Sequence, residues 1–252
     1  MSKPSLIASI SSGKGGVGKT FIAVNLAACL ARKRKKTLVV DCDLGLSNID
    51  IMLGINPKLT LKDVIFGDAN VKDVLITTKG GFDFIPASSG AKEMAQLLYE
   101  SIETIKNAIT DIAEGYDYVL LDIGAGISET VLQFNLFASR NIIVLNRELT
   151  SLTDAYAMIK VIYQMFGRDS FDIIVNSARD EEEAKRIFNH IDGICRKFLG
   201  FPLHFLGHIV YDDSVQQSIM KQKLLMQLFP GSVPAGNCIH IADVMTRWQT
   251  SS

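Results

Sequence analysis

Short apolar runs alternate with longer segments of helical periodicity along most of the chain. The apolar runs are rich in β-branched residues, and several are almost continuously hydrophobic, which is typical of strands buried on both faces of a parallel sheet. Strands are predicted at residues 6–11, 37–41, 82–86, 118–122, 141–146, 172–176 and 204–210. Helices are predicted at residues 20–32, 91–113, 129–137, 151–165, 181–198 and 214–228.

The repeated alternation of strand and helix predicts one mainly parallel, twisted sheet with helices on both faces, a three-layer α/β/α arrangement. The chain has 252 residues, a length that suits one large α/β domain. No linker, repeat or low-complexity segment divides it. We therefore expect residues 1–252 to form a single domain.

Composition and charge narrow the functional classes. Hydrophobic residues make up 48% of the chain and charged residues 21%, which is typical of a globular rather than a disordered protein. The net charge of −1 gives no global attraction to nucleic acid or to an anionic membrane, so direct nucleic-acid binding is not expected. A basic run at residues 32–36 follows the first predicted helix, and we interpret it as cations at the negative end of a helix dipole.

The cysteines and the apolar segments indicate the cellular compartment. The four cysteines are scattered and form no CxxC pair, which argues against a disulfide framework or a zinc site and favours a reducing cytoplasm. The first residues show no secretory leader, and no stretch is apolar for long enough to span a bilayer. We therefore expect a cytoplasmic protein, and reversible peripheral contact with the inner face of the cell membrane stays open.

Residues 13–20 read GKGGVGKT and satisfy the pattern GxxxxGK[ST] between a predicted strand and a predicted helix. The glycines let backbone N–H groups turn toward phosphate oxygens, and the following helix adds its positive N-terminal end. In this pattern Lys19 reaches the β- and γ-phosphates of a bound nucleotide such as ATP, and the Thr20 hydroxyl ligates Mg²⁺. The residues expected to contact the nucleotide here are Gly13, Lys14, Gly15, Gly16, Val17, Gly18, Lys19, Thr20 and Phe21.

The same glycines also fit GxGxxG, the loop of dinucleotide-binding folds. Asp41 lies roughly the right distance beyond them, about 20 residues, for the acidic residue of such a fold. A dinucleotide site, however, has no function for Lys19 and Thr20 directly after the last glycine, and it needs no second acidic strand end. This chain has both features, so the P-loop interpretation is favoured.

Two acidic segments follow predicted strands. Residues 118–122 read YVLLD; a carboxylate at the end of a buried strand, here Asp122, can hold Mg²⁺ through a water, and Gly124 leaves room for its backbone N–H to approach the γ-phosphate. Asp41 and Asp43 follow the second strand and would lie beside the P-loop at the carboxyl edge of the sheet. One acid can then act near Mg²⁺ and the other can position the attacking water, unless the pair forms a solvated acidic turn.

Lys14 adds a second lysine to the P-loop, and the patterns DxDxG at residues 41–45 and DxGAG at residues 122–126 follow it. In these residues, their order and their spacing, the chain resembles the deviant Walker A (MinD/ParA) ATPases. Other segments are similar to the flagellar-number regulators of the FlhG/FleN group rather than to plasmid-partition or division-site members. These segments are residues 43–54, 85–97 and 150–161.

The resemblance implies an ATPase that forms an ATP-sandwich homodimer with Mg²⁺ as its cofactor. Lys14 of each subunit would reach the phosphates bound by the other subunit, and Lys19 would contact the phosphates of its own. Asp43 would orient the hydrolytic water, with Asp41 and Asp122 near the metal. The implied catalytic residues are therefore Asp43, Lys14 and Lys19.

Three residues farther along the chain take roles from the same resemblance. Asn176, at the end of a predicted strand, matches the asparagine that reads adenine, because its amide can pair with the donor and acceptor edge of the base. The alternative is a side chain that caps the strand end. Glu148 and Asp154 fall where the family places acids that engage the signature lysine or the dimer interface.

The chain departs from the family's pattern at three places. Ile123 stands where a threonine is common, residues 146–149 read NREL instead of a TPEP-like sequence, and Val210 replaces a loop proline. Ile123 removes a hydroxyl beside Asp122, so the switch chemistry is expected to be slower than usual.

We therefore expect a slow ATPase whose ATP-bound dimer binds flagellar assembly or regulatory proteins, and whose hydrolysis restores the monomer. One alternative is a partner-binding member that hardly hydrolyses its nucleotide. Another is a ParA- or MinD-like positioning ATPase that acts on DNA or at the division site. An electron-transfer ATPase of the iron-protein type is disfavoured, because Cys29 and Cys42 fall in buried elements instead of bridging a cluster.

Residues 236–248 are predicted to form a last helix with Cys238, Ile241, Met245 and Trp248 along one face. Such a face either packs on the protein core or contacts a membrane or a partner. The opposite face carries few cations, so attraction to anionic lipid would be weak. We favour packing on the core.

Overall fold

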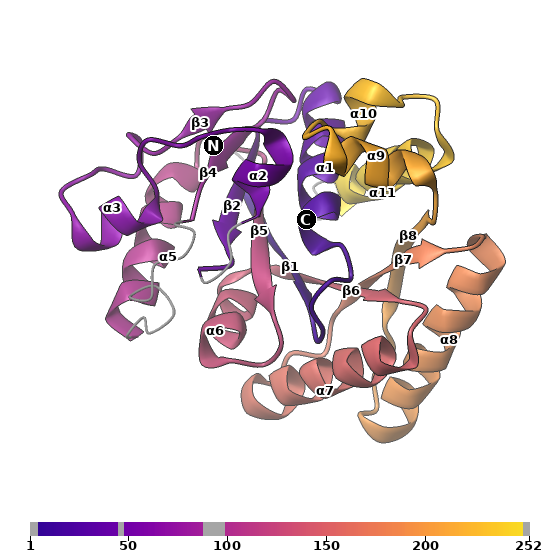
Figure 1. Cartoon of the computed structure of the whole chain (residues 1–252). Coiled ribbons are helices and arrows are strands. Elements are labelled where there is room, and N and C mark those ends of the chain that lie inside the picture. The colour runs from indigo at the N-terminus through magenta and orange to yellow at the C-terminus, as the bar shows by residue number, and fades with distance from the viewer. Residues whose placement is uncertain (1–4, 45–47, 88–98, 249–252) are drawn as a thin grey trace.

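A computed structural model describes residues 5–44, 48–87 and 99–248 and places them around one eight-stranded sheet (Figure 1). The strands are β1 (Leu6–Ser12), β2 (Thr37–Cys42), β3 (Ile76–Thr77), β4 (Asp83–Ile85), β5 (Tyr118–Ala125), β6 (Arg140–Asn146), β7 (Asp172–Ala178) and β8 (His204–Val210). Their order is β3-β4-β2-β5-β1-β6-β7-β8, and neighbours pair in parallel except for the antiparallel pair of β3 and β4. The predicted, mainly parallel sheet is confirmed.

Helices cover both faces of this sheet. They are α1 (Lys19–Arg32), α2 (Ile49–Leu53), α3 (Leu61–Phe66), α5 (Tyr99–Ala113), α6 (Glu129–Phe137), α7 (Leu149–Phe166), α8 (Glu181–Phe198), α9 (Asp213–Met220), α10 (Leu225–Leu228) and α11 (Val233–Trp248). One buried cluster joins the sheet to α1, α2, α10 and α11, and a second joins it to α3 and α5–α8. The predicted three-layer arrangement is therefore confirmed.

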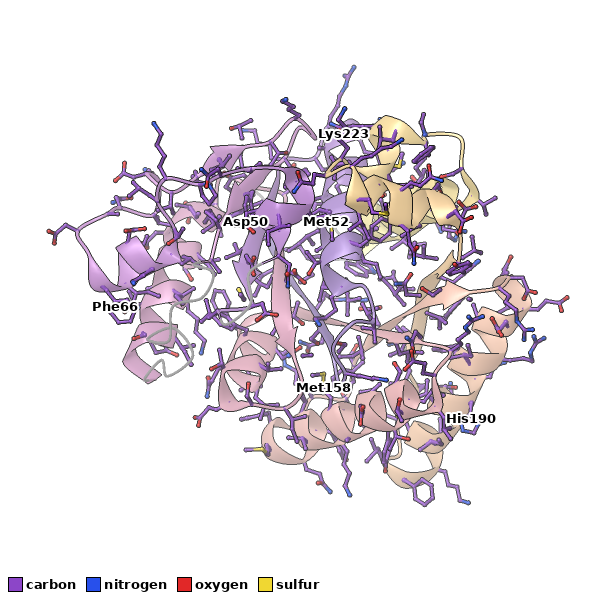
Figure 2. All side chains as sticks on the ribbon, viewed as in Figure 1. Asp50, Met52, Phe66, Met158, His190 and Lys223 are labelled. Atoms are coloured by element: carbon purple, nitrogen blue, oxygen red, sulfur yellow. The ribbon has the colours of Figure 1, made fainter. Side chains whose placement is uncertain are left out.

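The continuous hydrophobic runs of the strands follow from these two cores. Val39 of β2 and Leu120 of β5 are buried in the cluster beneath α1 and α11, whereas Val40 and Leu121 are buried beneath α5–α8. Since successive side chains of a strand point to opposite faces, both positions have to be apolar. In Figure 2, Met158 of α7 lies between its helix and the sheet, and this side chain is fully buried.

The predicted continuous helix over residues 214–228 is wrong. α9 ends at Met220, and α10 begins only at Leu225. Between them, Gln222 adopts a left-handed backbone with φ of 52°, which a continuing α-helix of L-residues does not contain. The chain therefore turns here, and two short helices replace one long one.

The remaining differences concern short or partly described elements. The two-residue strand β3 and the short helices α2 and α3 are not predicted from the sequence pattern. Of the predicted helix over residues 91–113, α5 covers the part from Tyr99, and residues 91–98 lie outside the described residues. The helix predicted over residues 151–165 begins two residues earlier, at Leu149.

The last helix, α11, packs against the sheet through its predicted apolar face. Cys238, Ile241 and Met245 are fully buried, and Cζ of Arg140 lies 4.2 Å from the centre of the Trp248 ring. Packing on the core is confirmed, and this face is not available to a membrane surface. The part of the chain that the structure describes contains no helix both long and apolar enough to cross a bilayer.

Candidate functional site

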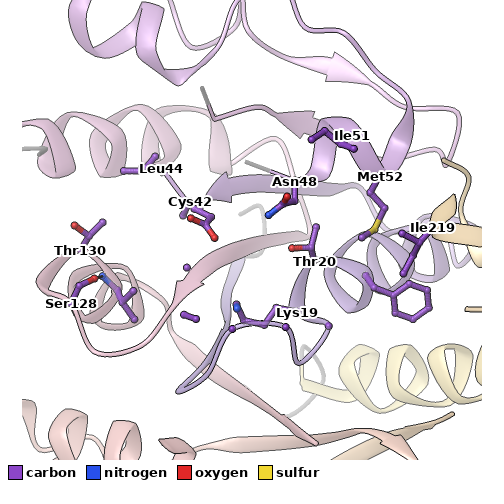
Figure 3. A pocket seen from close by; sticks show the side chains of 18 residues that line it. Lys19, Thr20, Cys42, Leu44, Asn48, Ile51, Met52, Ser128, Thr130 and Ile219 are labelled. Carbon is purple, nitrogen blue, oxygen red and sulfur yellow. Dashed lines mark hydrogen bonds between the residues drawn. The ribbon is translucent and has the colours of Figure 1, made fainter. Parts of the chain in front are cut away.

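A cavity with a volume of about 690 Å³ opens at the carboxyl edge of the sheet, beside the loop between β1 and α1 (Figure 3). This volume lies within the range of small-molecule sites. Lys19, Thr20 and Asp43 line its polar part, and Met52 of α2 and Ile219 of α9 line an apolar part. The cavity therefore offers contacts both for a charged group and for an apolar one.

Two glycines let neighbouring segments approach the P-loop closely. Gly18 caps α1 with a left-handed backbone, φ 93°, and a Cβ here would lie 2.3 Å from the amide nitrogen of Asn176. A Cβ at Gly13 would lie 2.2 Å from the backbone of Asp154 in α7. Any other residue would force these segments apart, so glycine is required at both positions.

Lys19 is a buried cation at the floor of this site. The residue is 9% exposed, and its ammonium donates a hydrogen bond of 3.0 Å to the Ser12 hydroxyl. Burial lowers the pKa of Lys19, and the negative charges of Asp122 and Asp43 act in the opposite direction. The ammonium thus lies between a neutral hydroxyl and two carboxylates, where it can form charge-assisted hydrogen bonds with an incoming phosphate.

Asp41 and Asp122 are register partners on the neighbouring strands β2 and β5, and both are buried. Burial raises the pKa of Asp122 to about 7, although a hydrogen bond from the Thr20 hydroxyl and the charge of Lys19 oppose this rise. Oδ1 of Asp122 is buried and has no hydrogen-bond partner among the described residues. A buried carboxylate oxygen without a partner is costly, and beside a threonine hydroxyl it fits a hard divalent cation.

Such a cation would need further ligands from a bound phosphate. Within residues 5–44, 48–87 and 99–248, no group of three or more His, Cys, Asp or Glu side chains is placed to hold a metal ion. Mg²⁺ is commonly bound by one or two carboxylates together with substrate phosphates and waters. Thr20 and Asp122 therefore fit the Mg²⁺ of a nucleotide complex.

Asp43 lines the cavity and is partly buried. Its backbone N–H donates a hydrogen bond of 3.0 Å to Oδ1 of Asp41, so Asp41 shapes the turn that carries it. A Cβ at Gly124 would lie 3.5 Å from Oδ1 of Asp43, which places this carboxylate against the C-terminal end of β5. The separately predicted motifs DxDxG, at residues 41–45, and DxGAG, at residues 122–126, thus meet in the folded chain. Gly45 of the DxDxG motif lies outside the described residues.

Lys14 is held away from the cavity by its own chain. Its ammonium forms an ion pair with Glu148 and donates a hydrogen bond of 3.0 Å to the Thr150 hydroxyl. Lys14 lowers the pKa of the Glu148 carboxyl. Asp154 contacts the P-loop through its backbone at Gly13, and the described residues show no ion pair between Asp154 and Lys14.

Asn176 supports the P-loop directly. Its side-chain amide donates a hydrogen bond of 2.7 Å to the backbone carbonyl of Val17, and the residue is 8% exposed. It is not one of the described residues that line the cavity. Contact with adenine stays a prediction for this residue, because the amide is engaged with the loop.

Sequence reasoning missed two parts of the site. Ser12, which holds Lys19, directly precedes the first glycine of the P-loop, and a serine at the end of a strand carries no motif of its own. The apolar wall of Ile51, Met52 and Ile219 joins α2 and α9, which come together only in the folded chain. The signal for Ser12 is its polar character at a fully buried strand position.

A protein-family model described as an AAA domain matches residues 5–173. Together with the P-loop, the two acidic strand ends and the additional lysine, this match gives the class. The chain belongs to this family of P-loop ATPases and is of the MinD/ParA type.

Individual relatives narrow this class. The chain is 37% identical over 245 residues to the antiactivator FleN of Pseudomonas aeruginosa, covering 97% of this chain and 88% of the relative. It is 27% identical over 239 residues to the flagellum site-determining protein YlxH of Helicobacter pylori, covering 94% and 80%. The predicted resemblance to the FlhG/FleN group is confirmed.

Solved structures have the same fold. The septum site-determining protein MinD complexed with Mg-ADP from Pyrococcus horikoshii matches with a TM-score of 0.82 at 24% identity, over 97% of each chain. The MinC:MinD cell division complex of Aquifex aeolicus matches with a TM-score of 0.80 at 26% identity, over 96% of each chain. The first likeness shows the fold, and the second agrees with the family assignment.

Proposed function

We propose that this chain is an ATP-dependent dimerising switch in the control of flagellar number or placement. The observation that carries the proposal is a cavity whose side chains fit a phosphate and a metal ion, combined with a second P-loop lysine, Lys14, that is held outside its own cavity. Since Lys19 already supplies a cation to the phosphates of its own subunit, Lys14 would act on the phosphates of another subunit. The names of the relatives FleN and YlxH support the flagellar role.

The residues of one subunit would divide the work of transferring a phosphoryl group to water. Lys19 and the N-terminal end of α1 neutralise charge on the β- and γ-phosphates. Thr20 and Asp122 would hold Mg²⁺, and the ion would offset the negative charge of the phosphates. Asp43 accepts a hydrogen bond from the attacking water and orients it, and Gly124 keeps the space beside that carboxylate open.

Slow turnover is part of the proposal. Ile123, which follows Asp122, is fully buried in the core beneath α5–α8 and offers no hydroxyl to the site. The water and the metal are therefore held by fewer protein groups than in relatives with a threonine at this position. A slow reaction suits a switch, since its rate sets how long the ATP-bound state lasts.

Lys14 would complete the site of the second subunit in an ATP-sandwich homodimer. To do so it has to leave Glu148 and Thr150 of its own chain. The side chains of Lys14 and Glu148 are 38% and 54% exposed, and ion pairs of this kind are weak because water and salt screen them. Charge-assisted bonds to phosphate are stronger, so ATP can draw the lysine across the interface.

The ATP-bound dimer would bind flagellar assembly or regulatory proteins in the cytoplasm. Peripheral contact with the inner face of the membrane would have to use a surface other than the buried face of α11. The net charge of −1 offers no general attraction to DNA, so a DNA-positioning role is less well supported.

Asp43→Ala tests the chemistry and the switch together. Without its water-orienting carboxylate, phosphate release should fall about a hundredfold while ATP binding is retained. Light scattering should then find the variant as a stable dimer with ATP. Lys14→Ala is the matched variant, and it should bind ATP as a monomer. Wild-type hydrolysis in the first variant, or an ATP-dependent dimer in the second, would contradict the proposal.

The flagellar role needs its own experiment. Flagella are counted by electron microscopy in cells that lack the gene and in cells that carry the wild-type or Asp43→Ala form. We expect an altered number without the gene, restored by the wild type and not by the variant. Unchanged flagellation in all strains would exclude this role and leave the ATPase cycle intact.

A further inference from the structure

Ser12 is the last residue of β1 and is fully buried. Its hydroxyl accepts a hydrogen bond of 3.0 Å from the Lys19 ammonium and donates one of 2.7 Å to the backbone carbonyl of Lys14. Its own carbonyl accepts a hydrogen bond of 2.9 Å from the backbone N–H of Gly126. One residue thus contacts both P-loop lysines and the loop after β5.

The strand is irregular at this place. The pairing of β1 with β5 shifts between Ile10 and Ser12, so that Ser12 lies opposite Ala125. Register shifts of this kind, like β-bulges, re-aim side chains and often lie beside active sites. Here the shift accompanies a hydroxyl that points to the P-loop instead of into either apolar core.

We propose that Ser12 is a positioning residue that holds Lys19 ready for the phosphates and keeps it off the carboxylates of the metal site. This inference rests on the proposed function in one respect, that the bound phosphates belong to ATP. An ammonium has three donors, so Lys19 can keep its bond to Ser12 and still direct two others at phosphate oxygens.

Two carboxylates compete with Ser12 for the Lys19 ammonium. The carboxylates of Asp122 and Asp43 are close enough to act on its charge, and Oδ1 of Asp122 lacks a partner among the described residues. A lysine stem is flexible, and a buried ammonium without an acceptor turns to the nearest negative oxygen. Without the Ser12 hydroxyl, Lys19 would therefore pair with Asp122 and compete with Mg²⁺ for the same oxygen.

A hydroxyl is suited to this position because it donates and accepts at once. It gives its proton to the Lys14 carbonyl and its lone pair to Lys19. Alanine can do neither, and a thiol of similar shape is a weak donor and a weak acceptor. Ser12→Ala and Ser12→Cys should therefore change nucleotide binding in the same direction.

Ser11→Ala is the matched control. Ser11 is the preceding residue of β1, is also fully buried, and donates a hydrogen bond of 3.0 Å to Oδ1 of Asn135 beneath the opposite helical layer. Both substitutions remove one buried hydroxyl from the same strand. Their effects on unfolding should be similar, whereas only Ser12 touches Lys19.

The experiment measures ATP affinity by isothermal titration calorimetry, with Mg²⁺ titrated separately, for the wild type and the three variants. Loss of a hydrogen bond to a charged group predicts about tenfold weaker ATP binding for Ser12→Ala. The Mg²⁺ concentration for half-maximal ATP binding should rise as well. Ser11→Ala should bind ATP and respond to Mg²⁺ as the wild type does.

Wild-type affinity and Mg²⁺ dependence in Ser12→Ala would overturn the inference, and so would an equal loss in Ser11→Ala. If Ser12→Ala does not fold, the near-isosteric Ser12→Cys decides in its place by the same criteria. A wild type that binds ATP but neither dimerises nor hydrolyses it would contradict the proposed function alone, because Ser12 is judged from affinities.

Discussion

Buried carboxylates lie at both ends of the parallel strands, which form the amino edge and the carboxyl edge of the sheet, and their surroundings differ. At the amino edge, Asp172 begins β7 and accepts two hydrogen bonds from the Arg140 guanidinium, at 3.0 and 2.9 Å. At the carboxyl edge, Asp122 keeps a buried oxygen that no described residue contacts by a hydrogen bond. Burial raises the pKa of both carboxyls, and at Asp172 the guanidinium opposes that rise.

This difference in hydrogen bonding distinguishes Asp172, a carboxylate that stabilises the fold, from Asp122, a carboxylate that is suited to bind a ligand. A buried charge whose oxygens are satisfied within the chain holds one arrangement of its neighbours in place. A buried charge with an oxygen left over costs stability until a ligand supplies the missing partner. The aromatic ring of Trp248 covers Arg140 at the amino edge, whereas the carboxyl edge opens into a cavity.

Arg140→Ala should have the largest effect, on stability. It leaves Asp172 buried without its guanidinium, and removal of one partner of a buried pair costs about 3 to 5 kcal/mol. Arg140 is itself 33% exposed, so we expect the lower end of this range, about 3 kcal/mol, in urea unfolding. ATP affinity should not change, because the pair lies at the opposite edge from the cavity.

Lys185→Ala is the control for this prediction, because it breaks the exposed ion pair with Glu181 on α8. Exposed pairs of this spacing contribute little to stability, because water and salt screen them. An equally small effect in Arg140→Ala would mean that Asp172 finds other partners, and the contrast between the two edges would fail.

Asp122→Asn should have the next largest effect and the opposite sign, a gain in the stability of the metal-free protein. The pKa of Asp122 in the folded state is about 7, above its ordinary value of 3.8, so the folded state keeps a proton that the unfolded state releases. Charging the carboxyl therefore costs stability as the pH rises between these values, and the neutral amide avoids this cost.

The rise in pKa corresponds to about 4 kcal/mol at most, and relaxation around the charge lowers this, so we expect a gain of about 2 kcal/mol near pH 8. Urea unfolding in EDTA near pH 5 and near pH 8 measures it, and the gain should be smaller at the lower pH. The variant should also lose the stabilisation that Mg²⁺ with ATP gives the wild type. A gain independent of pH would show that the charge of Asp122 is not its cause.

Trp248→Leu should have the smallest of the three effects, a loss of about 1 kcal/mol, because leucine keeps apolar contact with the core and removes the ring that Arg140 contacts. Phe198→Leu is its control, since Lys197 lies 5.2 Å from the centre of a ring that is 64% exposed, and its loss should be smaller still. Co-sedimentation with anionic liposomes should be the same for the wild type and Trp248→Leu. Pelleting that depends on Trp248 would mean that α11 leaves the sheet.

Much of the fold was predictable because its signals are local. The strands of the central sheet are continuous apolar runs, and their burial in two cores explains why both faces read as hydrophobic. The end of α9 was not predictable, since the turn depends on the backbone of Gln222 and not on a change in periodicity. The apolar periodicity of α11 is typical both of a helix that packs on the core and of one that lies on a membrane surface. The two cases differ only in whether the folded sheet covers the apolar face.

The candidate site also contains residues that local motifs predict and contacts that form only in the folded chain. Lys19, Thr20 and Asp122 follow from motif spacing, and the structure brings all three together. The ion pair of Lys14 with Glu148 joins positions 134 residues apart, so no local pattern contains it, and it was expected only from the family resemblance.

The sequence contains one tryptophan, and its position makes it a natural optical probe. The Trp248 ring contacts Arg140 at the amino edge, and the cavity lies at the carboxyl edge of the sheet. Its fluorescence should report directly on the release of α11 from the sheet during unfolding. A ligand in the cavity can alter this emission only if its binding shifts strands or helices as far as the opposite edge. Nucleotide-dependent emission from the unlabelled wild-type protein would therefore reveal mechanical coupling between the two ends of the strands.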